Sequence, residues 1–143
     1  MLVRMVADVV ALRPRFVHIM AGTNDVAGNT GAMTVAQTCA NLKAMAQLAR
    51  ANGIGVLLAD VPPAARFGWR PEVRPAAAIA EINRWIAAYA RAEKLAHVDY
   101  GPVLGMADGA MRPALGPDGV HPNAAGYAAM RGVIDPILKA RRI

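Results

Sequence analysis

A carboxylate and an imidazole lie three positions apart near the carboxyl end of the chain. Asp118 and His121 belong to a segment rich in glycine and proline that precedes an expected helix. At this spacing the carboxylate can hold one ring nitrogen of the imidazole and leave the other free to take a proton. The pair predicts acid–base chemistry, with His121 as base and Asp118 as its orienting group. The sequence contains no serine, so the nucleophile that such a pair often activates is not a serine of this chain.

A second segment whose residues could take part in catalysis follows an apolar run at residues 16–21. That run leads directly into Gly22, Thr23, Asn24 and Asp25. A glycine at this point lets backbone and substrate approach closely, and the neutral amide of Asn24 is a fixed donor of the kind that an oxyanion needs. We expect Asp25 to fix the loop as an acceptor. Taken alone, the segment is more typical of an Asx turn that closes a strand-to-helix loop than of an oxyanion site.

Together the two segments resemble the SGNH hydrolases, also called the GDSL esterase and lipase family. Residues 22–25 are similar to the third conserved block of that family, whose Asn donates to the oxyanion. Residues 118–123 are similar to the fifth block, which supplies the catalytic Asp and His, and Gly126-Tyr127 follows as in the family. The resemblance covers essentially the whole chain. It implies a hydrolase of small carboxylic esters that needs no cofactor and no metal.

The same resemblance assigns the site residues. Asp118, His121 and Asn24 would be catalytic, and Gly22, Thr23 and Asp25 would form the loop that binds the small-molecule ester.

The chain also departs from the family pattern. The first block, Gly-Asp-Ser on the first strand, is absent, and so is the second block, whose Gly gives a backbone oxyanion donor. The chain therefore resembles the C-terminal part of the fold, with its N-terminal strands missing. This would leave the strand at 16–21 without a neighbour, and a free apolar edge is a liability that proteins cover. We expect a homo-oligomer, or a rearranged N-terminal segment, to cover it.

Four nucleophiles are open in a chain without serine. Thr23 lies in the oxyanion loop, but nothing directs its hydroxyl to His121. Cys39 occupies a core-like helical position. Asp118 as a nucleophile would leave His121 without its orienting group. Water activated by His121 is the remaining option. The rival function is a catalytically inactive family member that persists as an oligomeric or ligand-binding module.

Composition limits the other function classes. The 143 residues carry a formal charge of +6 and predict one domain, residues 1–143. Their basic residues are scattered without interleaved aromatics, so we expect no nucleic-acid partner. The lone cysteine and three histidines lack metal-ligand spacing. No apolar run is long enough to span a membrane, and the first residues do not form a signal peptide, so the chain as it stands is expected to be cytoplasmic.

Helical and strand patterns alternate along the chain. The pattern predicts an α/β fold with three layers, α/β/α, and a short parallel sheet of the flavodoxin-like type. In such sheets ligands bind beyond the carboxyl ends of the strands, where both motif segments should lie. The predicted helices span 2–12, 34–51, 75–94 and 124–139, and the predicted strands span 16–21, 54–60 and 96–99.

Several other residues have more than one interpretation. Phe67 and Trp69 lie in the long loop after the second strand, where they could line an acyl or alcohol pocket or simply anchor the loop. Asp60, at the end of that strand, could border the site. We expect His18 and His97 to be hydrogen-bonded residues of the core or of an interface.

Overall fold

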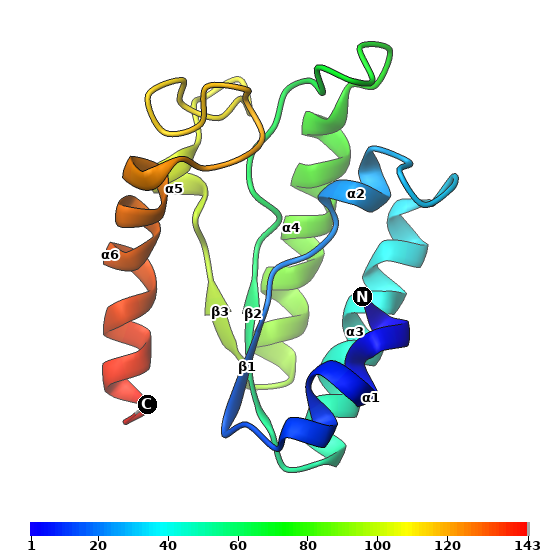
Figure 1. Cartoon of the computed structure of the whole chain (residues 1–143), viewed down its shortest axis with the longest axis vertical. Coiled ribbons are helices and arrows are strands. Elements are labelled where there is room, and N and C mark those ends of the chain that lie inside the picture. The colour runs from blue at the N-terminus through cyan, green and yellow to red at the C-terminus, as the bar shows by residue number, and fades with distance from the viewer. Residues whose placement is uncertain (143) are drawn as a thin grey trace.

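The computed structural model describes residues 1–142 and shows a three-stranded parallel sheet with the order β1-β2-β3 (Figure 1). The strands are β1 (Phe16–Ile19), β2 (Gly55–Ala59) and β3 (Ala96–Val98). Strands β2 and β3 are largely buried between helices, as parallel strands require, whereas β1 is only partly buried, with Ile19 inside and His18 exposed. The predicted parallel sheet is confirmed, although each strand is shorter than expected. Pairing of β1 ends where Ile19 lies opposite Leu58, before the chain turns away at residues 20–22.

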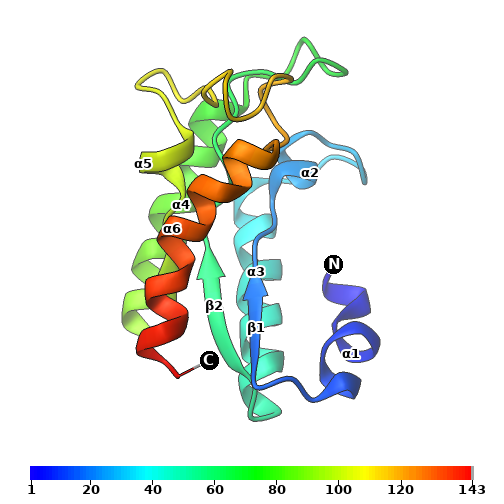
Figure 2. The same cartoon turned by 60° about the vertical axis from the view of Figure 1, so that its left-hand side comes forward.

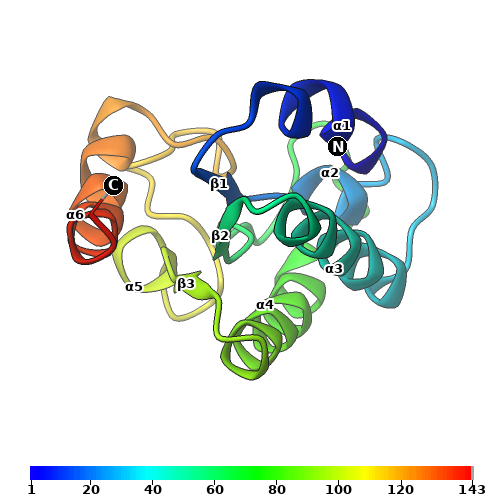
Figure 3. The same ribbon diagram turned by 90° about the horizontal axis from the view of Figure 1, so that it is seen from below.

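Helices cover both faces of the sheet, which makes the predicted three layers (Figure 3). Residues of β2 alternate between two cores. Val56 and Leu58 pack with α3 and α4, whereas Leu57 and Ala59 pack with α5 and α6. The covering helices are α3 (Val35–Ala51), α4 (Pro75–Ala92), α5 (Gly101–Leu104) and α6 (Ala124–Ala140).

The predicted helix at 2–12 is wrong. Only α1 (Met5–Asp8) is α-helical, and 3₁₀ turns at Leu2–Arg4 and Val10–Leu12 flank it. Met5 is the one buried residue of the three elements. Short helices are marginal unless an apolar face is buried, and here the β-branched valines face solvent or only partly pack. The segment therefore breaks into single turns.

The other predicted helices are confirmed within two residues at each end. Two short helices were not predicted, because each lies in what reads as a Gly-rich loop: α2 (Thr23–Val26) and α5. Both follow strands directly, α2 after β1 and α5 after β3. They therefore lie at the carboxyl end of the sheet, where the candidate site is expected.

Strand β1 is an edge strand. Within residues 1–142 its backbone pairs with β2 and with no other strand. The N-terminal segment does not add a strand to it. Helix α1 lies to one side of β1 (Figure 2), and the turn at Leu2–Arg4 contacts α3. Within the described residues the N-terminal segment, one of the two covers expected for this edge, therefore does not pair with the β1 backbone as a strand.

Candidate active site

The Asp118–His121 pair forms as predicted. Oδ2 of Asp118 lies 2.7 Å from Nδ1 of His121. Oδ1 accepts hydrogen bonds from the backbone N–H groups of His121 and Val120, at 2.8 and 2.9 Å. These three bonds favour the ionised carboxylate, and they lower the pKa of Asp118 from 3.8 to about 2, the backbone bond from His121 contributing most. Within residues 1–142 no hydrogen bond engages Nε2 of His121, whose side chain is 72% exposed.

Local turns explain why the chain brings this pair together. Gly119 has a φ of +77°, which L side chains rarely adopt, and it lets the backbone fold back over the Asp118 carboxylate. Just beyond, the Asn123 side chain caps α6 by accepting from the backbone N–H of Gly126 at 3.0 Å. The same side chain donates to the carbonyl of Ala114. The loop that carries His121 is therefore fastened to the start of α6.

The second motif forms a one-turn helix at the end of β1 rather than an Asx turn. Gly22 precedes α2 with a φ of +134°. A Cβ atom at this position would lie 2.8 Å from Cγ2 of Val61. The glycine thus allows a sharp turn against the loop after β2. Within the described residues the carboxylate of Asp25 makes no hydrogen bond, and Asp25 contributes to the loop through its backbone carbonyl, which accepts from Gly28.

Asn24 is held by a neighbour that the sequence did not single out. The side-chain Nδ2 of Asn29 donates to Oδ1 of Asn24 at 3.0 Å, and the two residues also share a backbone hydrogen bond. Oδ1 of Asn29 in turn accepts from the indole N–H of Trp69 at 3.0 Å. The carbonyl end of the Asn24 amide is therefore occupied, and its N–H₂ group is the end left for a ligand.

Trp69 brings the two motif loops together. Its indole stacks on the imidazole of His121, with ring centroids 6.2 Å apart and an interplanar angle of 28°. The indole also stacks on the ring of Phe67, with the ring centroids 5.1 Å apart. Phe67 is 1% exposed and anchors the loop, whereas Trp69 is 45% exposed. The loop after β2 thus links Asn24 to His121 through one exposed ring.

The remaining histidines are hydrogen-bonded, as predicted. Nε2 of His18 lies 3.2 Å from the hydroxyl of the buried Tyr100, and desolvation of the ring lowers the pKa of His18, although the residue is exposed on β1 and does not belong to the core. His97 pairs with Asp60 at 2.6 Å, forming a second imidazole–carboxylate pair at the ends of β2 and β3. Burial raises the pKa of Asp60, and the hydrogen bond from His97 opposes that shift. Asp60 is only 7% exposed, so this pair is a feature of the interior.

The structure separates the candidate nucleophiles. Cys39 is buried in the core on α3, as predicted, and burial raises the pKa of its thiol, which disfavours the reactive thiolate. Thr23 begins α2, and no hydrogen bond within residues 1–142 joins its hydroxyl to His121. Asp118 is committed to the three hydrogen bonds described above.

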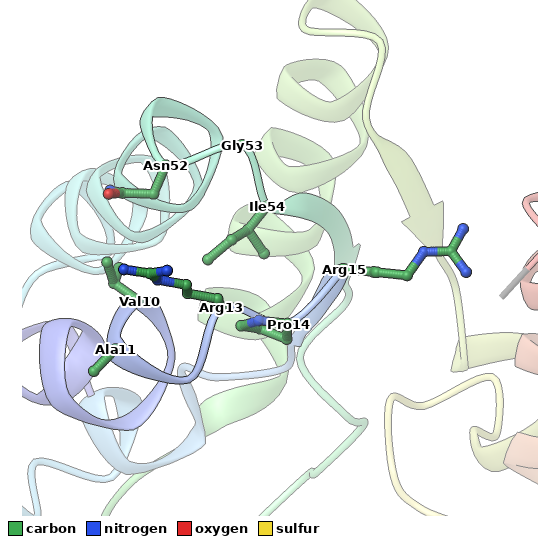
Figure 4. A pocket seen from close by; sticks show the side chains of 8 residues that line it. All are labelled: Val10, Ala11, Arg13, Pro14, Arg15, Asn52, Gly53 and Ile54. Carbon is green, nitrogen blue, oxygen red and sulfur yellow. The ribbon is translucent and has the colours of Figure 1, made fainter.

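A surface pocket of about 550 Å³ lies at the opposite end of the sheet, before β1 and β2 (Figure 4). Its lining includes Arg13, Asn52 and Ile54, while the Arg15 side chain points away from the others. The pocket therefore belongs to the amino ends of the strands and contains none of the motif residues. In residues 1–142, no three His, Cys, Asp or Glu side chains gather as a metal site. No helix there is sufficiently long and apolar to cross a membrane.

Comparison with known proteins decides the family. A model of the GDSL-like lipase/acylhydrolase family matches residues 1–129. The chain belongs to this family. A protein assigned as an acylhydrolase from Bacteroides fragilis NCTC 9343 is 41% identical, with a TM-score of 0.94; the match covers 98% of this chain and 68% of that one. A GDSL-like lipase from Bacteroides thetaiotaomicron VPI-5482 is 43% identical, with a TM-score of 0.93, covering 98% and 69%.

A more distant structure shares the fold of this GDSL-family chain. An acetyl-xylooligosaccharide esterase from Geobacillus stearothermophilus, in a mutant form, is 22% identical with a TM-score of 0.71, covering 96% of this chain and 64% of that one. No curated protein matches the chain. The family and its hydrolase fold are thus established, and the roles of individual residues are inferred from their geometry.

The sequence interpretation did not single out Asn29, and it did not decide the role of Trp69. Asn29 lies five positions after Asn24 in a Gly-rich turn, where a polar side chain is ordinary. Trp69 was left open between pocket and anchor. An exposed tryptophan in a loop beyond a strand end was the available signal, but its partner Asn29 is 40 positions away.

Proposed function

We propose that this GDSL-family chain hydrolyses small carboxylic esters, with water as the nucleophile and His121 as the general base. Asp118 orients the imidazole, and the Asn24 amide donates to the oxyanion. Gly22, Thr23 and Asp25 form the backbone of the loop beside the bound ester. The observation that carries the proposal is the 2.7 Å bond between Asp118 and His121, which leaves Nε2 exposed beside Trp69.

The Asp118 contact supports a base at Nε2. A carboxylate at Nδ1 keeps the proton on that nitrogen, so the lone pair of the neutral imidazole resides on Nε2. It also stabilises the imidazolium that forms when the ring takes a second proton. Since the pKa of Asp118 is about 2, the carboxylate stays ionised at neutral pH.

The proposed reaction proceeds in two steps. A water molecule attacks the acyl carbon while Nε2 of His121 accepts one of its protons, and the carbonyl π electrons move onto oxygen to give a tetrahedral oxyanion. The N–H₂ group of Asn24 donates to that oxyanion. The oxyanion then collapses, the bond to the alkoxide breaks, and the leaving group takes the proton from His121. The products are one carboxylic acid and one alcohol.

This arrangement predicts slow catalysis. Enzymes that lack a triad member keep roughly 10³–10⁴-fold of rate over uncatalysed hydrolysis through the oxyanion hole and binding. Here one side-chain donor serves the oxyanion, and the exposed site gives the base and the oxyanion little protection from water. Short acyl groups, such as acetyl, suit a site with so little enclosing surface.

The test compares turnover of p-nitrophenyl acetate by the parent chain and by His121→Ala and Asn24→Ala. We expect both variants to lose most of the activity. The Asn24 variant is the critical control, because an exposed imidazole acting as a solution catalyst would survive that change. If both variants match the parent, this site is not the catalyst, and the measured activity comes from a contaminant or from other exposed side chains.

We also propose that the free edge of β1 pairs with β1 of a second copy. The support is the row of unpaired backbone groups on a partly buried apolar strand. Sedimentation equilibrium tests this: we expect a concentration-dependent dimer that His18→Lys, a charge on the exposed strand, weakens. Thr30→Lys, which places the same charge in the exposed loop between α2 and α3, is the control. A parent chain that stays monomeric at high concentration refutes it.

A further inference from the structure

Two hydrogen bonds connect Trp69 to Asn29 and Asn29 to Asn24, and we call this chain the amide relay. The indole of Trp69 can donate a hydrogen bond but cannot accept one, and this fixes the direction of both bonds. Since Nε1–H can only donate, the atom of Asn29 that meets it at 3.0 Å must be the amide oxygen. The nitrogen of the Asn29 amide therefore faces the other way. It lies 3.0 Å from the Asn24 side chain, whose facing atom must be an acceptor, its oxygen.

We propose that Trp69 and Asn29 are positioning residues that set the polarity of the Asn24 amide. An asparagine amide can rotate to offer either its oxygen or its nitrogen in one direction. The relay ties down the oxygen and leaves the N–H₂ group to meet the substrate. This inference rests on the proposed function, since it explains how Asn24 becomes a donor rather than a second acceptor.

The geometry favours a built relay over a chance contact. Asn29 holds Asn24 twice, through the side chain and through its backbone N–H to the Asn24 carbonyl at 3.0 Å. Trp69 is itself held by stacking on the buried Phe67. Its other ring contact is His121. One side chain therefore aligns the base by packing and the oxyanion donor by hydrogen bonding.

Two substitutions of Asn29 separate polarity from mere packing. In Asn29→Ala the Asn24 amide loses its bias; if both orientations are then equally populated, kcat falls only about twofold. In Asn29→Asp the carboxylate still accepts from Trp69 but now attracts the N–H₂ group of Asn24. A charge-assisted bond of that kind biases the amide roughly 10- to 100-fold toward the wrong orientation.

We therefore expect a ranking of the two variants by loss of kcat that a packing effect alone does not produce. The near-isosteric Asn29→Asp loses about 10- to 100-fold in kcat, more than the smaller Asn29→Ala, and KM changes little. Combined with Asn24→Ala, neither change has a further effect, because the amide that they orient is gone. A loss in Asn29→Asp that persists in the Asn24→Ala background would mean a general charge effect on His121 and would overturn the proposal.

A second measurement does not depend on activity. Proton NMR follows the indole N–H of Trp69, with Trp85 as internal reference. We expect the Trp69 proton to exchange faster with water in Asn29→Ala than in the parent or in Asn29→Asp, which keeps the acceptor. Equal exchange in all three refutes the relay. If Asn24→Ala leaves turnover unchanged, the proposed function fails while this exchange test still decides the relay.

Discussion

Replacing Gly22 by alanine should destabilise the protein and displace the oxyanion loop. The backbone at Gly22 has a φ of +134°, which a residue with a Cβ adopts only under strain. The added Cβ would also lie 2.8 Å from Cγ2 of Val61, closer than real Cβ contacts come. Because Gly22 precedes α2, any relief of this strain shifts the helix turn that carries Asn24.

The magnitude follows from three contributions. A residue held in a sparsely populated backbone region costs about 1–3 kcal/mol. Overpacking a well-filled site costs typically 1–3 kcal/mol. Against these, alanine restricts the unfolded chain and returns roughly 0.4–1 kcal/mol. The free energy of unfolding should therefore fall by about 1–5 kcal/mol, a large share of the stability of a small domain.

Urea denaturation followed by circular dichroism measures this change, and the chain provides a matched control. Gly31 has a φ of +103° but no atom within 4 Å of the position of its Cβ. Gly31→Ala thus keeps the backbone strain and lacks the clash with Val61. We expect Gly22→Ala to lose at least about 1 kcal/mol more than the control. Equal losses in the two variants would refute the assigned steric contact.

Further predictions concern the acid–base pair and the thiol. Asp118→Asn should lower ester turnover about 10²-fold, the smaller end of what general-base catalysis contributes, measured as kcat. Since the folded pKa of Asp118 is lowered from 3.8 to about 2, its contribution is present above pH 3.8 and is lost as the pH falls toward 2. The carboxyl is 53% exposed, so solvent screening limits that loss to about 1 kcal/mol or less; acid denaturation of the parent should show it, and that of Asp118→Asn should not. Cys39→Ala should leave turnover unchanged while lowering the free energy of unfolding by about 1 kcal/mol; a loss of turnover would restore the thiol as a nucleophile.

Local signals made most of the fold predictable. Thr34 and Gln37 form a capping box, which is why the helix expected at 34–51 is found as α3 at Val35–Ala51. The strands were readable from short apolar runs, unbroken in β2 and interrupted by one histidine each in β1 and β3. The N-terminal helix was not, because Met5 alone of its apolar residues is buried, while Val3 and Val6 face solvent and Leu2, Val9 and Val10 pack only partly against the core. Periodicity predicts a helix only where tertiary packing completes it.

The site was predictable to the extent that its contacts are local. Asp118 and His121 are three positions apart, so sequence spacing alone suggested their hydrogen bond. Trp69 and Asn29 are 40 positions apart and meet because the segments that carry them follow β2 and β1, which are neighbours in the sheet. No periodicity or turn preference encodes such a contact. The direction of the hydrogen bonds in the relay follows only from the atomic positions, since an amide carries both a donor and an acceptor and the sequence does not say which way each points.

The loop between β2 and α4 contains neither motif, but Trp69 links it to both motif segments. The base lies in the segment before α6 and the oxyanion donor in the segment after β1. Trp69 contacts His121 directly and is linked to Asn24 through Asn29. A change of this ring should alter proton transfer through His121 and oxyanion binding through Asn24 together. Trp69→Phe distinguishes the two influences, because phenylalanine retains stacking on His121 and removes the indole donor. Loss of kcat without a change in its pH dependence would assign the effect to the amide relay, and a shifted pH profile would assign it to the base.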